Sequence, residues 1–518
     1  MTFTIDEESS GKGPSKSTHT FEEAVTLIGN GKFHFMLLIA TGCSLLGVIM
    51  EGLNMAIVLP AAKCDIEITT TEQGLINAIG FIGVVLSSHF WGFMSDTWGR
   101  LKVLRFALFW GFTFSIASSF VSTSKMLLIM RFLVGFFLSG VQAAALLYLG
   151  EFHCYKNRAK YVTFAAIFMP MSIVYQPVMG WLIMTMDWKY TILGFVYRPW
   201  RLYMALSSLI NAFAYCLFLF LPESPKFMLA MGKPEEALDI LIIGYKVNGG
   251  KDKFPVTQIS LESVGSNLAD TRKLGATVKM MWDQTWPLFK PPYLTNIILL
   301  CYLAFVSFFV GHGIYMWYPQ ILALSYPNMN ARLTMCEVLA MTWSKQEIEI
   351  IDTVTSEVIE FSCQLENDST TYQIILVMGL TFCCIYGMVA LNVKRCGKSL
   401  LFPIWLLVST TTTLCIIWAN LFYFHVVLTI LMISCGYCGS IITAVAVDLF
   451  PTHYKGMALC LVMMFGRIGA VVGSNFVGAL LDGECTAIFT INASLLSVAT
   501  VICFIVMRKT DSITENNS

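Results

Sequence analysis

The chain alternates long apolar runs with short polar connections. Twelve runs hold about 20 or more mostly apolar residues each, the length that a helix needs to cross a bilayer. Their expected spans are 34–60, 74–95, 102–122, 125–149, 161–186, 200–221, 294–320, 372–393, 399–420, 422–447, 456–480 and 485–507. This pattern predicts an all-α membrane protein with twelve transmembrane helices.

The longest polar stretch between the runs separates the sixth run from the seventh. We therefore expect two bundles of six helices, joined by a linker and flanked by two polar tails. The expected parts are a tail over 1–33, a bundle over 34–221, a linker over 222–293, a bundle over 294–507 with a large loop over 321–371, and a tail over 508–518.

Composition agrees with a membrane protein. Of the 518 residues, 56% are hydrophobic and 13% charged, whereas soluble domains carry about 25% charged residues. The apolar composition makes the lipid bilayer an expected partner. The formal net charge is zero, so we expect no nucleic acid as a partner. The sequence has no phosphate-binding loop and no H-E-x-x-H or paired C-x-x-C motif, and we expect no cofactor, no metal and no enzymatic activity.

Basic residues predict the orientation, because Lys and Arg accumulate on the cytoplasmic side of membrane proteins. With the N-terminus placed in the cytoplasm, 24 of the 33 Lys and Arg residues fall on that side and seven on the other. Both termini and the linker are therefore expected to be cytoplasmic. The plasma membrane and a secretory or synaptic-type vesicle both fit this topology.

The loop over 321–371 is then expected in the lumen or outside the cell. It contains the glycosylation sequon Asn367-Asp368-Ser369. Cys336 and Cys363 share this loop, and in an oxidising compartment they could pair with one another. Two free thiols are the alternative.

Two marks recur at nearly the same offset in the two halves. Gly99-Arg100 follows the second run and Gly397-Lys398 follows the eighth, 298 residues later. The acid–base pair Glu151 and Arg158 follows the fourth run, and Asp448 and Lys455 follow the tenth, 297 residues later. We infer two pseudo-symmetric halves related by an axis along the membrane normal.

The charges of these short turns suggest a role. Gly99 permits a tight turn, and Arg100 is expected within reach of Asp96 or Glu151. Such pairs could latch helices together when the cytoplasmic side is closed and separate when it opens. The alternative is that they only fix topology and the shape of the turn. The latch predicts that Asp96→Ala shifts the distribution between inward-open and outward-open states.

At these residues the sequence resembles the major facilitator superfamily, whose most common signature is similar to Asp96-x-x-Gly99-Arg100. Glu151-x6-Arg158 and the segment PESPKF at 222–227 resemble the sugar and organic-ion porter branch. Arg198-Pro199-Trp200-Arg201 and Val58-Leu59-Pro60 resemble the synaptic vesicle glycoprotein 2 group and its invertebrate relatives. The resemblance implies alternating access between two bundles. Lys394-Arg395-Cys396-Gly397-Lys398 departs from it, because it lacks the acid often found before the Gly.

Charged residues inside the runs are costly and mark candidate binding sites. Glu51 and Asn54 lie on one face of the first helix, and Glu51 could bind a cationic group or carry a proton. The alternative is a structural carboxylate. Arg131 could extend toward the interface or pair with an acid. Arg467 lies near the middle of its run, where it requires a partner or a watery cavity, and Glu51 is one possible partner.

Aromatic and polar residues gather in the seventh run. His312 could relay protons or could be a packed residue. Tyr315, Trp317 and Gln320 follow, and with Trp181 of the fifth run they could line an aromatic pocket that attracts organic cations. The alternative is a belt of aromatic residues at the membrane interface.

Together these features predict a secondary active or facilitative transporter of a small organic solute. The solute could be an organic cation, an organic anion or sugar-like, and a proton could be coupled to it. The alternative is a transport-inactive relative that serves in trafficking or as a receptor. The amides at Asn54 and Gln320 favour it, because the similar vesicle glycoproteins carry acids there, and the retained loops at Asp96–Arg100 and Glu151–Arg158 disfavour it. A monomer is expected.

Overall fold

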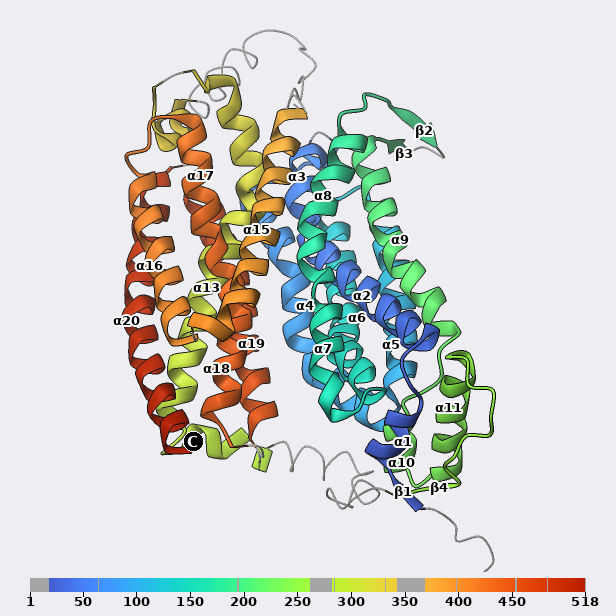
Figure 1. Cartoon of the computed structure of the whole chain (residues 1–518). Helices are drawn as coiled ribbons and strands as arrows, with labels where there is room; N and C mark the ends of the chain where they lie inside the picture. Colours follow the sequence, from blue (N-terminus) through green and yellow to red (C-terminus); the bar gives the residue numbers. More distant parts are fainter. Residues whose placement is uncertain are drawn as a thin grey trace, which may run out of the picture.

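The computed structural model is almost entirely helical (Figure 1). It describes residues 18–63, 65–192, 195–260, 282–283, 285–330, 332–341, 369–396, 398–451, 454–481 and 483–517. Within them, eleven helices are long and apolar enough to cross a membrane, and a twelfth has a shorter apolar part, Ser369–Ile385. The predicted helical membrane fold is confirmed, with helix bounds close to the expected runs.

The first bundle contains six membrane-spanning segments in chain order. They are formed by α2 (Lys32–Leu53) with α3 (Met55–Ala62), α4 (Thr70–Thr97), α5 (Arg100–Ser118), α6 (Ser124–Glu151), α7 (Tyr155–Ala166) with α8 (Phe168–Met184), and α9 (Pro199–Leu219). Local sequence explains several of the ends. Thr69 and Glu72 form a capping box at the start of α4, and Pro199 begins α9, where its missing N–H costs no hydrogen bond.

The second bundle repeats this arrangement. Its segments are α13 (Leu294–Ser325) with η3 (Tyr326–Asn328), α15 (Ser369–Cys396), α16 (Lys398–Ile416), α17 (Phe422–Ile433) with η4 (Ser434–Cys438) and α18 (Gly439–Leu449), α19 (Lys455–Leu480), and α20 (Cys485–Asn517). Helix α20 continues beyond the expected end at 507. Two apolar cores fill the first bundle, one of which reaches Tyr372 of α15. A third fills the second bundle and extends to Leu53, Ala56 and Ile173 of the first.

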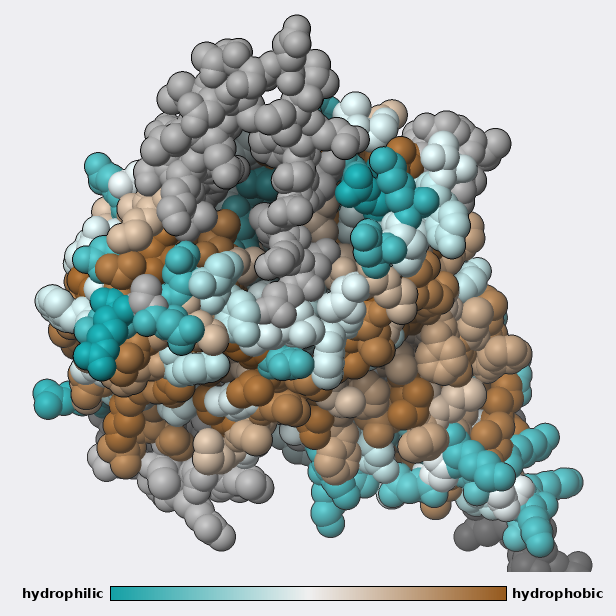
Figure 2. All heavy atoms as spheres, turned by 90° about the horizontal axis from the view of Figure 1, so that it is seen from above, coloured by the Kyte–Doolittle hydropathy of each residue, from teal (hydrophilic) through white to brown (hydrophobic). Residues whose placement is uncertain are grey.

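Figure 1 places the C-terminus and the linker elements at one end of the molecule, which we call the linker side, and the hairpin β2–β3 at the other, the loop side. The hairpin pairs β2 (Tyr190–Ile192) antiparallel with β3 (Phe195–Tyr197). Seen from the loop side, hydrophilic side chains gather on the near face, while apolar side chains cover the flanks (Figure 2). This distribution is that of a protein surrounded by lipid.

The N-terminal tail and the linker fold together on the linker side. Strand β1 (Thr18–Thr20) pairs in parallel with β4 (Gln258–Ser260). Helix α1 (Phe21–Leu27) buries Phe21 and Val25 in a small core shared with the linker helices α10 (Pro225–Ala230) and α11 (Pro234–Val247). The short helix η2 (Trp286–Phe289) precedes α13. The apolar face of α1 is thus covered by protein.

Three contacts between the bundles lie near the loop-side ends of their helices. The amide of Gln73 in α4 donates to Gln320 in α13 over 2.5 Å. Gly74 packs against α19, where an added Cβ would stand 3.3 Å from Oδ1 of Asn475. Gly180 of α8 packs against the ring of Tyr372 in α15. These contacts bring the two halves together on the loop side.

Candidate substrate-binding site

A cavity lies between the two bundles and is lined by residues of both. About 680 Å³ of space between atoms lies within it, part of which is open solvent. Helices α2, α3, α4 and α6 contribute most of the wall, and α13 and α19 complete it. Apolar residues and glycines form most of the lining, and the polar side chains in it are Glu51, Asn77, Arg131, Gln142, His312 and Arg467.

Glu51 forms an ion pair with Arg131 inside the first bundle. Arg131 Nη1 donates to Glu51 Oε2 over 2.8 Å. The side chain of Arg131 is 2% exposed and that of Glu51 is 1% exposed. Ser115 donates to the other carboxylate oxygen over 2.6 Å, and Ser118 accepts from the guanidinium. Of the two alternatives for Arg131, pairing with an acid is therefore the one observed. The two opposite charges cancel.

Asn54 completes this network, one turn from Glu51 on the same helix face. Its amide nitrogen donates to Glu51 Oε2 over 3.1 Å, and its oxygen accepts from Arg131 over 3.3 Å. An amide can serve both partners, because it has a donor and an acceptor. Asn54 thus contacts both members of the ion pair, in the turn between α2 and α3.

Arg467 lies in α19 on the opposite wall of the cavity. Its guanidinium donates to Oε1 of Gln142 in α6 over 2.5 Å, a hydrogen bond that joins the two bundles. In the part of the chain that the structure describes, no carboxylate forms an ion pair with Arg467. The possible partner proposed from the sequence, Glu51, is instead paired with Arg131.

His312 reaches the cavity from α13. Its ring stacks on Phe308 with centroids 4.8 Å apart and meets the edge of Phe81 at 6.0 Å. Its Nδ1 has no hydrogen-bond partner within the described residues. His312 is therefore packed against aromatic rings, as one of the two alternatives held, and it also lines the cavity. Its part in a proton relay stays a prediction.

The aromatic pocket expected from the seventh run is not formed at the cavity. Trp317 is completely buried and donates from Nε1 to the carbonyl of Ser474 over 2.8 Å, which also excludes a place in an interfacial belt. Tyr315 is buried in the core of the second bundle, while Trp181 is 39% exposed. Gln320 contacts Gln73 near the loop side. The prediction failed because side chains of one helix face in different directions.

The signature turn on the linker side forms a charged cluster within the first bundle. Arg100 contacts Asp96 at 3.0 Å and Glu151 at 3.3 Å, so the expected reach of Arg100 is confirmed. Gly99 has φ +116°, and an added Cβ would stand 2.5 Å from Glu223, so only glycine fits here. Arg158 pairs with Glu22 of α1 at 3.1 Å. The latch itself stays a prediction.

Several residues of these sites were missed by sequence reasoning. Glu223 accepts from the backbone N–H of Leu101 over 2.8 Å at the start of α5, which gives the PESPKF segment a structural role. Gln142 and Asn77 line the cavity. Both are polar residues within apolar runs, and this signal could have identified them.

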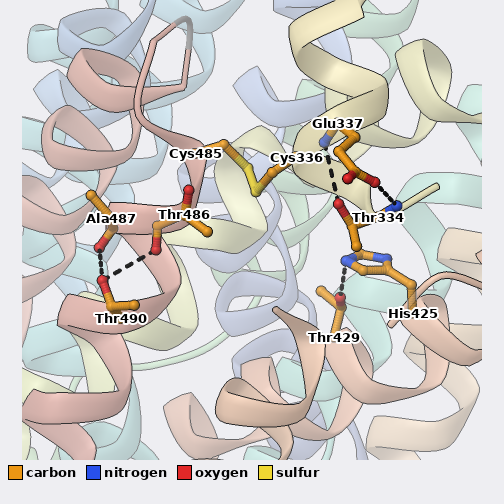
Figure 3. Close-up of a disulfide and its surroundings, with 9 residues drawn as sticks. All are labelled: Thr334, Cys336, Glu337, His425, Thr429, Cys485, Thr486, Ala487 and Thr490. Carbon is orange, nitrogen blue, oxygen red and sulfur yellow. Dashed lines mark hydrogen bonds between the residues drawn. A yellow bond between two sulfur atoms is a disulfide. The ribbon is translucent and has the colours of Figure 1, made fainter. Parts of the chain in front are cut away.

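The expected disulfide between Cys336 and Cys363 is wrong. Cys336 is bonded to Cys485 at the start of α20, with Cα atoms 5.4 Å apart (Figure 3). The two cysteines are 149 residues apart in sequence, and nothing in the sequence indicated this pairing. Cys363 and the sequon at Asn367 lie outside the described residues, as do the side chains of Asp448 and Lys455. No group of three or more potential metal ligands occurs in the described residues.

Two family models match the chain. The sugar (and other) transporter model matches residues 13–326, and the major facilitator superfamily model matches residues 364–518. Among similar proteins, human synaptic vesicle glycoprotein 2B is 24% identical over 59% of this chain and 47% of its own length. A putative transporter of Caenorhabditis elegans, svop-1, is 33% identical over 45% of this chain and 43% of its own. This chain thus spans about half the length of the curated relatives that it matches.

Solved structures with a similar fold include the xylose transporter XylE of E. coli. In its partially occluded inward-open conformation, it matches 91% of this chain and 97% of its own, with a TM-score of 0.61 and 13% identity. A crystal structure of a D-xylose–proton symporter matches with a TM-score of 0.59 and 14% identity. These structures show the same two-bundle fold, and the two family models place the chain among transporters of the major facilitator superfamily, which are not enzymes.

Proposed function

We propose that this chain, which belongs to the sugar (and other) transporter family, is a secondary transporter that carries a small organic solute by alternating access. The cavity between the bundles supports this proposal most directly, because both halves contribute charged side chains to it. In such folds the substrate site lies near the midplane between the repeats. Rocking of one half against the other would expose this cavity to each side in turn.

The closed side in this structure is the loop side. Gln73 with Gln320, and Gly74 with Asn475, hold the halves together there. Solute entering from the loop side would have to separate these contacts. The arrangement fits an inward-facing state, provided that the linker side is cytoplasmic.

The disulfide supports that orientation independently of the Lys and Arg count. Disulfides persist in oxidising compartments and are rare in the cytosol. The bond between Cys336 and Cys485 lies at the loop-side end of α20, so the loop side would face the lumen or the outside. Both termini would then be cytoplasmic, in either the plasma membrane or the membrane of a secretory vesicle.

Proton coupling would act at the ion pair between Glu51 and Arg131. Protonation of Glu51 would remove the negative charge that holds Arg131 and would change the hydrogen bonds that connect α2, α5 and α6. Because Glu51 also lines the cavity, its protonation and the binding of the solute would be linked. The chain would then use a proton gradient to accumulate its solute.

Uptake by purified protein in liposomes tests this function. The solutes are a panel of sugars, nucleosides, organic cations and carboxylates, each with and without a pH gradient. We expect accumulation driven by the gradient for the wild type and for Glu235→Gln, a matched change at an exposed linker carboxylate. Glu51→Gln should lose this dependence. Uptake by Glu51→Gln with unchanged pH dependence would refute the role of Glu51.

The transport-inactive alternative makes a different prediction for the same preparation. It requires that no solute accumulates and that labelled pairs across the two halves report a single fixed conformation. Two populations that interconvert would exclude a rigid scaffold even before a solute is known.

A further inference from the structure

We infer that the solute is an organic anion and that its acidic group binds Arg467. This inference rests on the proposed transport function and names the class of solute for the same cavity. It depends on the charge balance of the cavity wall, on the hydrogen-bonding capacity left on Arg467, and on the neutral polar groups around it.

The charges that line the cavity do not cancel. Glu51 and Arg131 neutralise one another through a bond of 2.8 Å. Three further side chains form hydrogen bonds with the pair, and Nε of Arg131 is buried without a partner among the described residues. Arg467 adds a positive charge, and its hydrogen-bond partner Gln142 is neutral. Within the described residues no carboxylate other than that of Glu51 lines the cavity. The wall therefore carries one uncompensated positive charge from its Arg and Glu residues.

A positive charge deep in a membrane protein is costly unless it is paired or faces water. Arg467 lies in the middle of α19, far from either end of the helix at Lys455 and Leu480. It remains partly exposed, and the space that it faces is the cavity. An anion entering this space would supply the missing counter-charge at the position where the protein provides none.

The guanidinium has the capacity to bind such a group. Arg presents five N–H donors in a planar fork, which suits the two oxygens of a carboxylate. Among the described residues, Gln142 is the one hydrogen-bond partner of Arg467. Lys would offer a point charge without this geometry. The site is thus suited to a planar acid group more than to a neutral hydroxyl.

Neutral polar atoms nearby would contact the rest of the solute. His312 and Asn77 line the cavity, and Nδ1 of His312 and Oδ1 of Asn77 are buried without a partner among the described residues. The rings of Phe81 and Phe308 flank His312. The ring of Phe81 provides an apolar surface in the cavity, and small rotations of the His312 and Asn77 side chains would offer hydrogen bonds to a small organic body. An organic cation, in contrast, would meet the uncompensated charge of Arg467 and be repelled.

Matched pairs of solutes test the inference by thermal unfolding of the full-length protein in detergent. Each pair differs by the acid group: D-glucuronate with D-glucose, nicotinate with nicotinamide, and benzoate with benzamide. A bound ligand raises the unfolding temperature. We expect stabilisation by an anion and not by its neutral partner. Arg467→Gln should abolish this stabilisation, and Arg467→Lys should retain part of it.

A labelling experiment measures the charge of the cavity without any solute. A thiol is introduced by Ile49→Cys, at a position on the cavity wall. Its reaction rates are measured with two methanethiosulfonates, the anionic sulfonatoethyl and the cationic trimethylammonioethyl reagent, and are normalised to those of free glutathione. Modification at position 49 is counted by peptide mass spectrometry, because the chain has other free cysteines.

With Arg467 in place, the anionic reagent should be favoured. Arg467→Gln should lower the ratio of the two rates by about ten-fold, as expected for a local field in a narrow cleft, while Arg467→Lys should leave it nearly unchanged. A ratio that does not respond to Arg467→Gln overturns the inference, whether or not a solute pair binds. Stabilisation by a neutral partner equal to that by its anion overturns it as well. Either result would leave proton-driven uptake of a neutral solute possible, so failure of the inference is distinguishable from failure of the transport function.

Discussion

Glu51 and Arg131 illustrate how single residues determine the polarity of the cavity. Each is almost completely buried, and the two are connected to Ser115 and Asn54 by hydrogen bonds. In such a network each charge offsets the free-energy cost of burying the other, so the loss of one leaves the other uncompensated. Arg467, which has a neutral partner, leaves its charge available.

Loss of one partner of the buried pair should destabilise the protein strongly. Glu51→Gln keeps the shape of the side chain but leaves Arg131 uncompensated, which typically costs about 3–5 kcal/mol. We expect a lower unfolding temperature for purified Glu51→Gln. The double variant with Arg131→Gln should recover part of the loss, because both charges are then absent. Additive losses in the double variant would contradict a direct pairing.

His153 should make stability depend on pH on the linker side. Its ring is buried against Tyr161, with centroids 3.9 Å apart, and against His34 at 4.8 Å. Burial lowers the pKa of His153 to about 4 from 6.5. Because the unfolded chain binds the proton more readily, the stability supplied by neutral His153 is present above pH 6.5 and is lost as the pH falls from 6.5 toward 4.

The difference between the two pKa values corresponds to roughly 3 kcal/mol at most. Thermal unfolding of the wild type and His153→Gln between pH 5 and pH 7 measures this contribution to stability. Most carboxylates stay ionised in this pH range, so their titration adds little to the slope. The wild type should lose stability more steeply toward low pH than His153→Gln, whose amide does not titrate. His89→Gln, a change at an exposed histidine, should keep the slope of the wild type. Equal slopes for all three proteins would argue against the shift.

At the scale of whole elements, the disulfide fixes the short segment after α13 to the start of α20. Cys336 lies next to Thr334 and Glu337, whose mutual hydrogen bonds begin a helical turn (Figure 3). Both cysteines belong to the second bundle, so the bond restrains one half and leaves the two halves free to move relative to one another.

Mass spectrometry under non-reducing conditions tests the pairing. Digestion should release a linked peptide pair that contains Cys336 and Cys485 from the wild type and also from Cys363→Ser. Cys485→Ser should lack this pair and should unfold more easily. The chain-entropy model allows about 4–5 kcal/mol for closing a loop of this length, an upper value here because the membrane already restrains the chain. A linked pair of Cys336 with Cys363 would refute the assignment.

The elements were predictable from sequence because apolar runs of membrane length are a strong signal, and so was the linker, because it interrupts them. Contacts between elements were much less predictable. Glu51 and Arg131 were recognised individually, but their pairing depends on the packing of α2 against α6. Trp317 looked like a pocket residue, yet its indole is directed at α19. A helical run indicates which residues are in the membrane and leaves open which neighbour each one faces.

For the molecule as a whole, the central question is whether the loop-side contacts open during function. They join α4 with α19 and α8 with α15, so each contact connects one half with the other. If the halves rock, these contacts must separate in every transport cycle. A covalent bond across them would hold the protein in the state described here.

The double variant Gly74→Cys/Asn475→Cys places such a bond between α4 and α19, since an added Cβ at Gly74 would lie 3.5 Å from Cα of Asn475. Oxidation should reduce uptake into liposomes to background, and mild reduction should restore it. The matched control, Thr410→Cys/Thr500→Cys, joins two hydroxyl positions 3.3 Å apart within the second bundle and should transport in both conditions. Full uptake by a protein cross-linked between α4 and α19 would show that the solute crosses without movement of the halves, and alternating access would have to be abandoned for this chain.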